Sequence, residues 1–168
     1  MLIMNTNRTA FLDMISHSEG TDYGAHNGYD ILCGSTRQHP KYFTGWTDHP
    51  RILVEFTDKT GKVNKSSAAG RYQILERFFD VYRKQLHLDD KTKYPFGPFS
   101  PAAQDAIALQ LINECHAIPL IDAGNLHGAI IACSSRWASL PGAGYDQHEQ
   151  TFAFLEASFK QAGGEIFA

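Results

Sequence analysis

A long stretch without any helical period lies between two segments that have one, and this contrast constrains the fold more than any other feature. From residue 21 to residue 67 the chain is crowded with Gly, Pro, Asp, Thr and His, and apolar residues do not recur every three or four positions. Tyr29–Cys33 and Ile52–Thr57 have strand character, and Asp58-Lys59-Thr60-Gly61 supplies a turn after the second. We therefore expect a small β-rich lobe over about residues 21–67.

Both sides of this lobe have the apolar spacing of amphipathic helices. Phe11, Met14, Ile15 and Ser18 form one helical face before the lobe, and Gly20 is a natural helix stop. The expected helices cover about residues 7–19, 68–86, 101–115, 126–140 and 152–162. The predicted fold class is α+β: one helix, a small β-rich lobe, then a mostly helical lobe. A chain of 168 residues is the size of one domain, which we expect to span residues 1–168.

Charge and composition exclude several classes of partner. The net charge is -3, the pI is about 6.2, and no dense run of Lys or Arg occurs, which argues against nucleic-acid binding. The longest apolar runs are only a few residues, so we expect no membrane insertion. The first residues lack the basic start and apolar length of a secretory signal, so we expect synthesis in the cytoplasm. Cys33, Cys115 and Cys133 are expected to be free thiols.

Glu19 stands at the end of the first apolar stripe, just before Gly20. The partial negative charge of a helix C-terminus disfavours the anion by only about 0.3–1 kcal/mol. Raising the pKa of a glutamate from about 4.3 to about 6 needs roughly 2.3 kcal/mol, so desolvation must supply the larger share. A glutamate that stays protonated near neutral pH is a suitable general acid for glycosidic bond cleavage. A solvated or capping glutamate is the alternative.

The stretch Ser66-Ser67-Ala68-Ala69-Gly70-Arg71-Tyr72-Gln73-Ile74 opens the second helical segment with small residues. Small side chains, including Ser67 and Gly70, let the backbone come close to a ligand or to another helix. Tyr72 offers a ring that can stack on a sugar, and Gln73 offers an amide for hydroxyl or acetamido groups. Tight helix packing and a core position for Tyr72 are the structural alternatives.

Several segments in the same order resemble the lambda phage endolysin family. They include AFLDMISHSEGTD, NGYDILCG, DHPR, AAGRYQIL, YRKQL, RWASLPGAGYDQ and FKQAGG, and they run from about Arg8 to Gly164. The stretches CGSTRQHPKYFTGW and KTKYPFGPFS look longer than the family pattern and are expected to be loop insertions. Members of this family are peptidoglycan lytic transglycosylases with a lysozyme-like fold.

The resemblance implies that Glu19 is the catalytic acid, because it falls in the family's S-E-G-T-D motif. In this family the glutamate protonates the bridging oxygen between N-acetylmuramic acid and N-acetylglucosamine, and the C6 hydroxyl of the muramic acid attacks to give a 1,6-anhydro sugar. One carboxyl can act as acid and then as base, because the substrate carries its own nucleophile.

The resemblance also implies an active-site cleft between the helical and β-rich lobes, with peptidoglycan glycan strands as the partner. The segment before Tyr145 would be one lip of the groove, which favours Tyr145 as a further sugar contact beside Tyr72 and Gln73. We expect a monomer without cofactor or metal, since a groove for a long polymer must stay open. A holin pore would let the protein pass from the host cytoplasm to the wall, with no direct contact implied.

Three other functions are weighed against this one. A hydrolysing muramidase would use a second carboxylate, for which Asp22, Asp30 and Asp48 are candidates, but the Asp and Thr of T-even phage lysozymes are replaced here by Gly28 and Gly34. A zinc amidase needs a ligand cluster, and none of the eight histidines lies in an H-E-x-x-H motif. A non-catalytic wall-binding module would need no perturbed acid.

Overall fold

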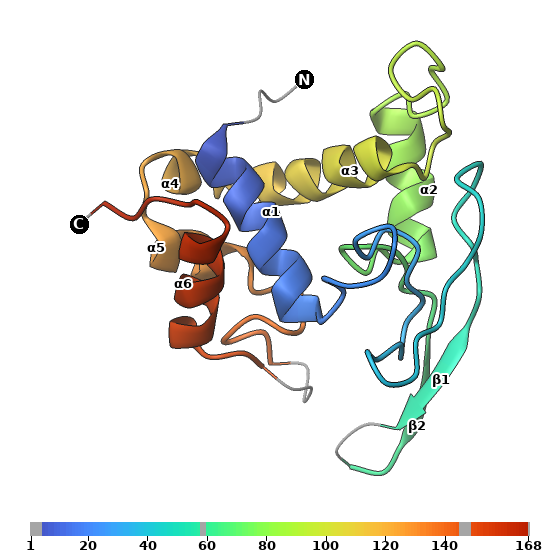
Figure 1. Cartoon of the computed structure of the whole chain (residues 1–168), viewed down its shortest axis with the longest axis horizontal. Coiled ribbons are helices and arrows are strands. Elements are labelled where there is room, and N and C mark those ends of the chain that lie inside the picture. Colours follow the sequence, from blue (N-terminus) through green and yellow to red (C-terminus); the bar gives the residue numbers. More distant parts are fainter. Residues whose placement is uncertain (1–4, 58–59, 145–148, 168) are drawn as a thin grey trace. The chain divides into compact units, whose positions relative to one another are not determined.

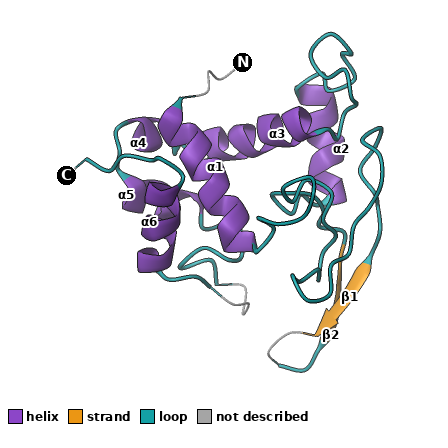
Figure 2. Cartoon of the chain, in the orientation of Figure 1, coloured by secondary structure: helices purple, strands orange, loops and turns teal. Residues whose placement is uncertain are grey.

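The computed structural model describes residues 5–57, 60–144 and 149–167. Within them lie six helices and one two-stranded antiparallel sheet (Figures 1 and 2), which confirms the α+β prediction. The elements are α1 (Thr6–Glu19), β1 (Val54–Thr57), β2 (Val63–Ser66), α2 (Glu76–Gln85), α3 (Pro101–Glu114), α4 (Ile118–Asp122), α5 (Leu126–Cys133) and α6 (Phe152–Gln161). The chain divides into two compact units, one formed by Met1–Glu19 with Leu109–Ala168 and the other by Gly20–Ala108.

In the first unit α1 packs against α4 and α6, and α4 packs against α5 (Figure 1). The predicted apolar face is the buried one, since Phe11, Met14 and Ile15 are fully buried. The side chain of Asn5 caps α1 by accepting a hydrogen bond from the amide of Arg8 at 2.8 Å. Gly20 follows the helix with a φ of 67°, the left-handed conformation that ends helices. The helix expected over residues 7–19 is therefore confirmed.

The helix expected over residues 126–140 is much shorter than predicted. Asn125 caps α5 as expected, since its side chain accepts a hydrogen bond from the amide of Gly128 at 3.0 Å. The helix ends at Cys133, and the chain turns so that Trp137 and Leu140 are both buried. The turn is stabilised by the amide of Arg136, which bonds to the carbonyl of Cys133. Trp137 and Leu140 are therefore buried as parts of a turn and not as one face of a helix.

The β structure lies in the second unit and is smaller than expected. β1 pairs with β2 in antiparallel register from Val54 opposite Ser66 to Thr57 opposite Val63 (Figure 2). The strand predicted over Tyr29–Cys33 is wrong, because Ile31 and Leu32 make only isolated bridges. Glycines 28 and 34 on either side have φ values of 85° and 69°, so the backbone leaves the extended conformation at both ends. Residues 58 and 59 of the predicted turn lie outside the described residues.

The second helical segment begins at Glu76, so the prediction that it opens near Ala68 is wrong. Gly70 and Gln73 have φ values of 77° and 48°, which no helix accommodates. The backbone instead folds back on itself, with Ala69 bridged to Ile74. This turn lies against Gln104, whose Oε1 accepts from the amide of Arg71 at 3.0 Å.

Gln104 connects three separate segments of the second unit. Besides the Arg71 amide, its Nε2 donates to the carbonyls of Tyr29 and Phe99, each at 2.9 Å. The side chain is fully buried, and its bonds to the Arg71 amide and the Phe99 carbonyl satisfy buried backbone groups, while its bond to the Tyr29 carbonyl is partly buried. Two of its three partners are 33 and 75 residues away, so no local sequence pattern indicates this role of Gln104.

We predict that Gly70→Ala destabilises the protein by about 2–4 kcal/mol. A Cβ at Gly70 would meet Oε1 of Gln104 at 2.1 Å, and the three hydrogen bonds of that amide prevent it from moving aside. The measurement is urea unfolding. Gly61→Ala is the matched control, since Gly61 has a similar φ of 85° and no atom of the described residues beyond its chain neighbours within 4 Å of the added carbon. Equal losses for the two variants would contradict the role of the Gln104 contact.

Candidate active site

Glu19 is the last residue of α1, where the buried face of the helix reaches its end. Ile15, one turn earlier on the same face, is fully buried, whereas Glu19 is half-buried and keeps some access to solvent. Burial among protein atoms raises the pKa of Glu19 from 4.5 to about 7, and hydrogen bonds from the side chain and backbone of Ser139 oppose this shift. Desolvation is therefore the largest cause of the raised pKa. This agrees with the sequence argument, in which the helix dipole alone is too weak to produce such a shift.

Ser139 supplies the polar contacts of this carboxyl. Its hydroxyl donates to Oε1 of Glu19 at 2.5 Å and accepts from the hydroxyl of Ser18 at 2.7 Å. Gln150 holds the same region together, because its amide donates to the carbonyl of Ser139 at 2.8 Å. All four residues belong to the first unit. The result is an acid that is largely desolvated yet hydrogen-bonded, with a pKa close to neutral.

A hydrogen-bonded carboxyl with this pKa can give up a proton near neutral pH and take it back. General acid–base catalysis is most effective when the pKa of the group is close to the working pH. In the protonated form Glu19 can donate to the leaving oxygen of a glycosidic bond, and in the ionised form it can accept a proton from an attacking hydroxyl. The site therefore has the properties of a single acid and base.

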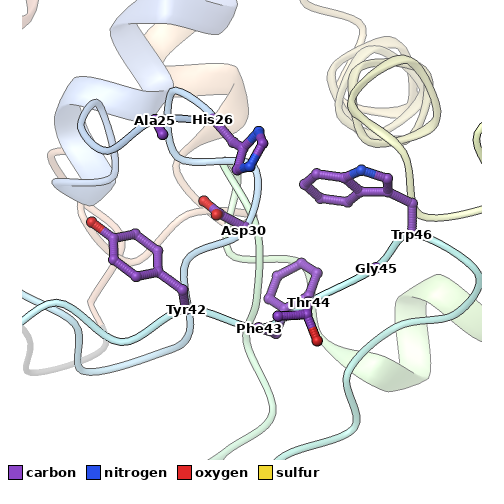
Figure 3. A pocket seen from close by; sticks show the side chains of 8 residues that line it. All are labelled: Ala25, His26, Asp30, Tyr42, Phe43, Thr44, Gly45 and Trp46. Atoms are coloured by element: carbon purple, nitrogen blue, oxygen red, sulfur yellow. The ribbon is translucent and has the colours of Figure 1, made fainter.

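The second unit contains an open pocket of about 450 Å³ (Figure 3). Tyr42, His26 and Trp46 surround it with rings, and the rings of His26 and Trp46 meet edge to face with centroids 5.7 Å apart. Asp30 is 8% exposed and lines the pocket, and its Oδ1 has no hydrogen-bond partner in the part of the chain that the structure describes. Aromatic walls with an unsatisfied carboxylate are suited to a ligand that has both apolar faces and hydrogen-bond donors. The pocket is lined by Ala25, His26, Asp30, Tyr42, Phe43, Thr44, Gly45 and Trp46.

The residues predicted as substrate contacts near position 70 have structural partners in the second unit. Tyr72 is 2% exposed, and its hydroxyl donates to Asp105 at 2.6 Å, which leaves the ring no open face for a sugar. Gly70 is buried against Gln104. The core alternative for Tyr72 and the packing alternative for Gly70 fit these contacts better than binding roles do.

The other predicted contacts are more accessible. Gln73 is half-buried and donates through Nε2 to the carbonyl of Gly70 at 3.0 Å. Ser67 is half-buried, and its hydroxyl accepts from the first amide of α2, that of Glu76, at 3.1 Å. Their binding roles stay predictions. Tyr145 lies outside the described residues, so its predicted sugar contact stays a prediction too.

Two groups of site residues escaped the sequence reasoning. Ser139 lies 120 positions from Glu19, and no spacing rule connects them. Its only signal was its place in the segment RWASLPGAGYDQ, where Tyr145 drew attention instead. Tyr42 and Trp46 lie in the stretch expected to be a loop insertion, whereas Asp30 was named only as a candidate second carboxylate of a hydrolase. Each of these positions is defined by tertiary contacts rather than by local pattern.

Neither a metal cluster nor a membrane span is found in the described part of the chain. No group of three or more His, Cys, Asp or Glu side chains is arranged to hold an ion there. Among the same residues, no helix combines the length and apolar character that crossing a membrane requires. The three cysteines are free thiols, with Cys133 buried and Cys33 and Cys115 half-buried.

The fold is lysozyme-like, as comparison with solved structures shows. The structure resembles bacteriophage lambda lysozyme complexed with a chitohexasaccharide, with a TM-score of 0.86 and 47% identity over 99% of this chain and all of that one. A second structure of lysozyme from bacteriophage lambda has a TM-score of 0.81, with the same identity and coverage.

Relatives known by sequence extend this likeness over the full length. The endolysin of Escherichia phage lambda is 48% identical over 170 residues, covering 99% of this chain and 97% of that protein. The endolysin of Escherichia phage P2 is 41% identical over 172 residues, covering 98% of each. The sequence profile of the endolysin family matches residues 9–166. The chain belongs to the endolysin family, and the predicted resemblance is confirmed.

We predict that Glu19→Gln increases the free energy of unfolding more at pH 8 than at pH 5. The folded pKa of about 7 lies above the ordinary value of 4.5, so the folded state keeps a proton that the unfolded chain releases. The resulting stability is fully present below about pH 4.5 and is lost as the pH rises through about 7. Between pH 5 and pH 8 the wild type should lose up to about 2 kcal/mol that the variant does not lose.

The measurement is urea unfolding of both proteins at the two pH values. Glu165→Gln is the control, because Glu165 is an exposed carboxylate in the same unit and its removal should give no gain that grows with pH. A gain from Glu19→Gln that is the same at pH 5 and pH 8 would show that burial does not perturb this carboxyl.

Proposed function

We propose that this chain is a lytic transglycosylase. It cleaves the β-1,4 bond between N-acetylmuramic acid and N-acetylglucosamine in peptidoglycan and forms 1,6-anhydromuramic acid, for lysis of the host cell. The observation that carries the proposal is the half-buried Glu19 with a pKa of about 7, held by hydroxyl and amide donors of Ser139 rather than by a second carboxylate. Membership of the endolysin family and the glycan bound by the lambda lysozyme support it.

In this mechanism protonated Glu19 gives its proton to the bridging oxygen as the bond from that oxygen to C1 of the muramic acid breaks. The N-acetylglucosamine leaves as an alcohol, and Glu19 becomes a carboxylate. That carboxylate then takes the proton of the C6 hydroxyl as the C6 oxygen bonds to C1. Glu19 ends protonated, no water is consumed, and an intramolecular nucleophile makes a second catalytic carboxylate unnecessary.

A hydrolysing muramidase is the second candidate, and one observation favours it. Asp30 is a buried carboxylate with an unsatisfied oxygen, and hydrolysing glycosidases commonly pair two carboxyl groups. Against it, positions 28 and 34 are glycines with positive φ and have no side chain to offer the reaction. In the hydrolytic route water replaces the C6 hydroxyl, so the products differ by one water.

We further propose that the protein acts as a monomer on long glycan strands. It would be made in the host cytoplasm and reach the wall through a holin pore. This part of the proposal follows from the family and from the need of a polymer site to stay open.

We predict that digestion of purified peptidoglycan yields anhydro-muropeptides, each one water lighter than its hydrolysed counterpart, as measured by mass spectrometry. Glu19→Gln should reduce the rate at least about 100-fold, because it removes the general acid, while the fold and glycan binding are kept. Products with only reducing-end muramic acid would establish the muramidase instead. Full activity of Glu19→Gln would overturn the assignment of Glu19 as the general acid, whereas glycan binding by the wild type without any cleavage would favour the wall-binding module.

The pocket of the second unit is proposed to contact the glycan strand. Tyr42→Ala should weaken binding of a chitooligosaccharide about three- to tenfold, since the ring is 43% exposed and its removal takes away a stacking face without opening the core. Asp30→Asn should also weaken binding of the chitooligosaccharide, because it replaces a carboxylate whose Oδ1 is proposed to accept a hydrogen bond from the sugar. The measurement is titration calorimetry in the Glu19→Gln background. Phe96→Ala is the control, an aromatic ring of the same unit that is 73% exposed and outside the pocket.

A further inference from the structure

The carboxyl of Glu19 is held from one side by a chain of hydroxyl groups. We propose that Ser139 is a positioning residue for Glu19. The hydroxyl of Ser139 accepts a hydrogen bond from Ser18 and donates one to the carboxyl of Glu19, and it thereby fixes the orientation from which the acid delivers its proton. The proposal deepens the proposed function, since it rests on Glu19 being the reacting acid.

The direction of the hydrogen bonds is what gives Ser139 this role. The Ser18 hydroxyl donates to the Ser139 oxygen at 2.7 Å, so the proton of Ser139 is left for Oε1 of Glu19, which it meets at 2.5 Å. A hydroxyl that accepts one bond is polarised and donates the next one more strongly. The backbone of Ser139 adds a second hydrogen bond to the same carboxyl. Both donors stabilise the charged form of Glu19.

The position of the Ser139 hydroxyl is fixed by the core of the first unit rather than by the site alone. Trp137 and Leu140 on either side are 4% and 0% exposed, which anchors the short segment that carries the serine. Gln150 connects both ends of the hydroxyl chain, because its backbone amide bonds to the carbonyl of Ser139 and its side-chain amide to that of Ser18 at 3.4 Å. A rigidly held donor preserves the geometry that proton transfer needs.

No charged group competes with Ser139 in setting the state of Glu19 among the described residues. The three largest causes of its pKa are burial and the two hydrogen bonds from Ser139. His17 lies two residues earlier on α1, and Glu149 follows on the segment after Ser139. The carboxylate of Glu149 accepts from the amides of Gly142 and Gly144 at 2.9 and 3.0 Å. The hydrogen bonds from Ser139 are therefore the main interactions that lower the pKa of Glu19 against the effect of burial.

The experiment compares Ser139→Ala, Ser139→Thr and Ser18→Ala with the wild type. The pH titration of Glu19 is followed by NMR of the side-chain carboxyl carbon in the free protein, and kcat and KM are measured across pH on solubilised peptidoglycan. Ser139→Ala should raise the titration midpoint by about one unit, because the anion loses its strongest donor. It should lower kcat about tenfold and change KM less than about twofold. Ser139→Thr keeps the hydroxyl and should restore both.

Ser18→Ala should shift the midpoint in the same direction by a smaller amount, since it only weakens the next bond in the chain. Ser134→Ala is the matched control, because its hydroxyl donates to the carbonyl of Ile131 at 2.9 Å in the same unit and makes no bond to Glu19. An unchanged midpoint in Ser139→Ala, or an equal shift in Ser134→Ala, overturns the proposal. Should Ser139→Ala not fold, the midpoint of Ser18→Ala decides, and no shift there overturns it.

The two readouts separate this inference from the proposed function. The NMR titration reports on Glu19 in the free protein whether the reaction makes anhydro or hydrolysed products. The mass of the products reports on the reaction whether or not Ser139 shifts the titration. A positioning role can therefore fail while transglycosylation stands, and the reverse.

Discussion

In the proposed mechanism, the chemistry depends on how far a single carboxyl, that of Glu19, is withdrawn from water. Full desolvation would keep Glu19 neutral and useless as a base, and full hydration would leave it ionised and useless as an acid. The half-buried position at the end of α1 raises its pKa, and two donors from Ser139 bring it back to about 7. Both the buried face of α1 and the turn that carries Ser139 are needed. The buried face removes water from the carboxyl, and Ser139 replaces part of the hydrogen bonding that water would supply.

The second unit meets a different constraint, since its backbone has few regular hydrogen bonds to rely on. Its only named strands are four residues each within the described part, and much of the chain between them and α3 is turns and single bridges. Buried backbone groups in such a segment need side chains as partners. Gln104 serves three of them at once, and Asp105 beside it accepts from the hydroxyls of Tyr29 and Tyr72. A short run on α3 thus organises loops that are far apart in sequence.

The parts of the fold that sequence could predict are those in which local pattern and tertiary structure agree. The stripe from Phe11 to Ile15, the cap at Asn125 and the start of α3 at Pro101 are confirmed, because each depends on neighbours within about one helical turn. The segment from Ala68 to Ile74 was predicted to open the second helical segment, and it does not. Its conformation is decided by Gln104, 34 positions beyond Gly70. The same limit applies to the site: the place of Glu19 on the apolar stripe indicates it from sequence, whereas the contact between Ser139 and Glu19 is apparent only in the folded structure.

A lone acid with a pKa near 7 fits an intramolecular nucleophile better than it fits water. Attack by water needs a base to be ionised while an acid elsewhere is protonated, which is why hydrolysing enzymes separate these roles over two carboxyl groups with different pKa values. Glu19 can fill both roles only in sequence, first as acid and then as base. In the proposed mechanism the bound sugar holds its own nucleophile in place between those steps, so that the reaction needs no second carboxylate to activate one. A C6 hydroxyl on the same ring meets that condition at a high effective concentration, whereas a diffusing water does not. The balance of burial and hydrogen bonding at Glu19 is therefore the physical reason for which we propose the anhydro product.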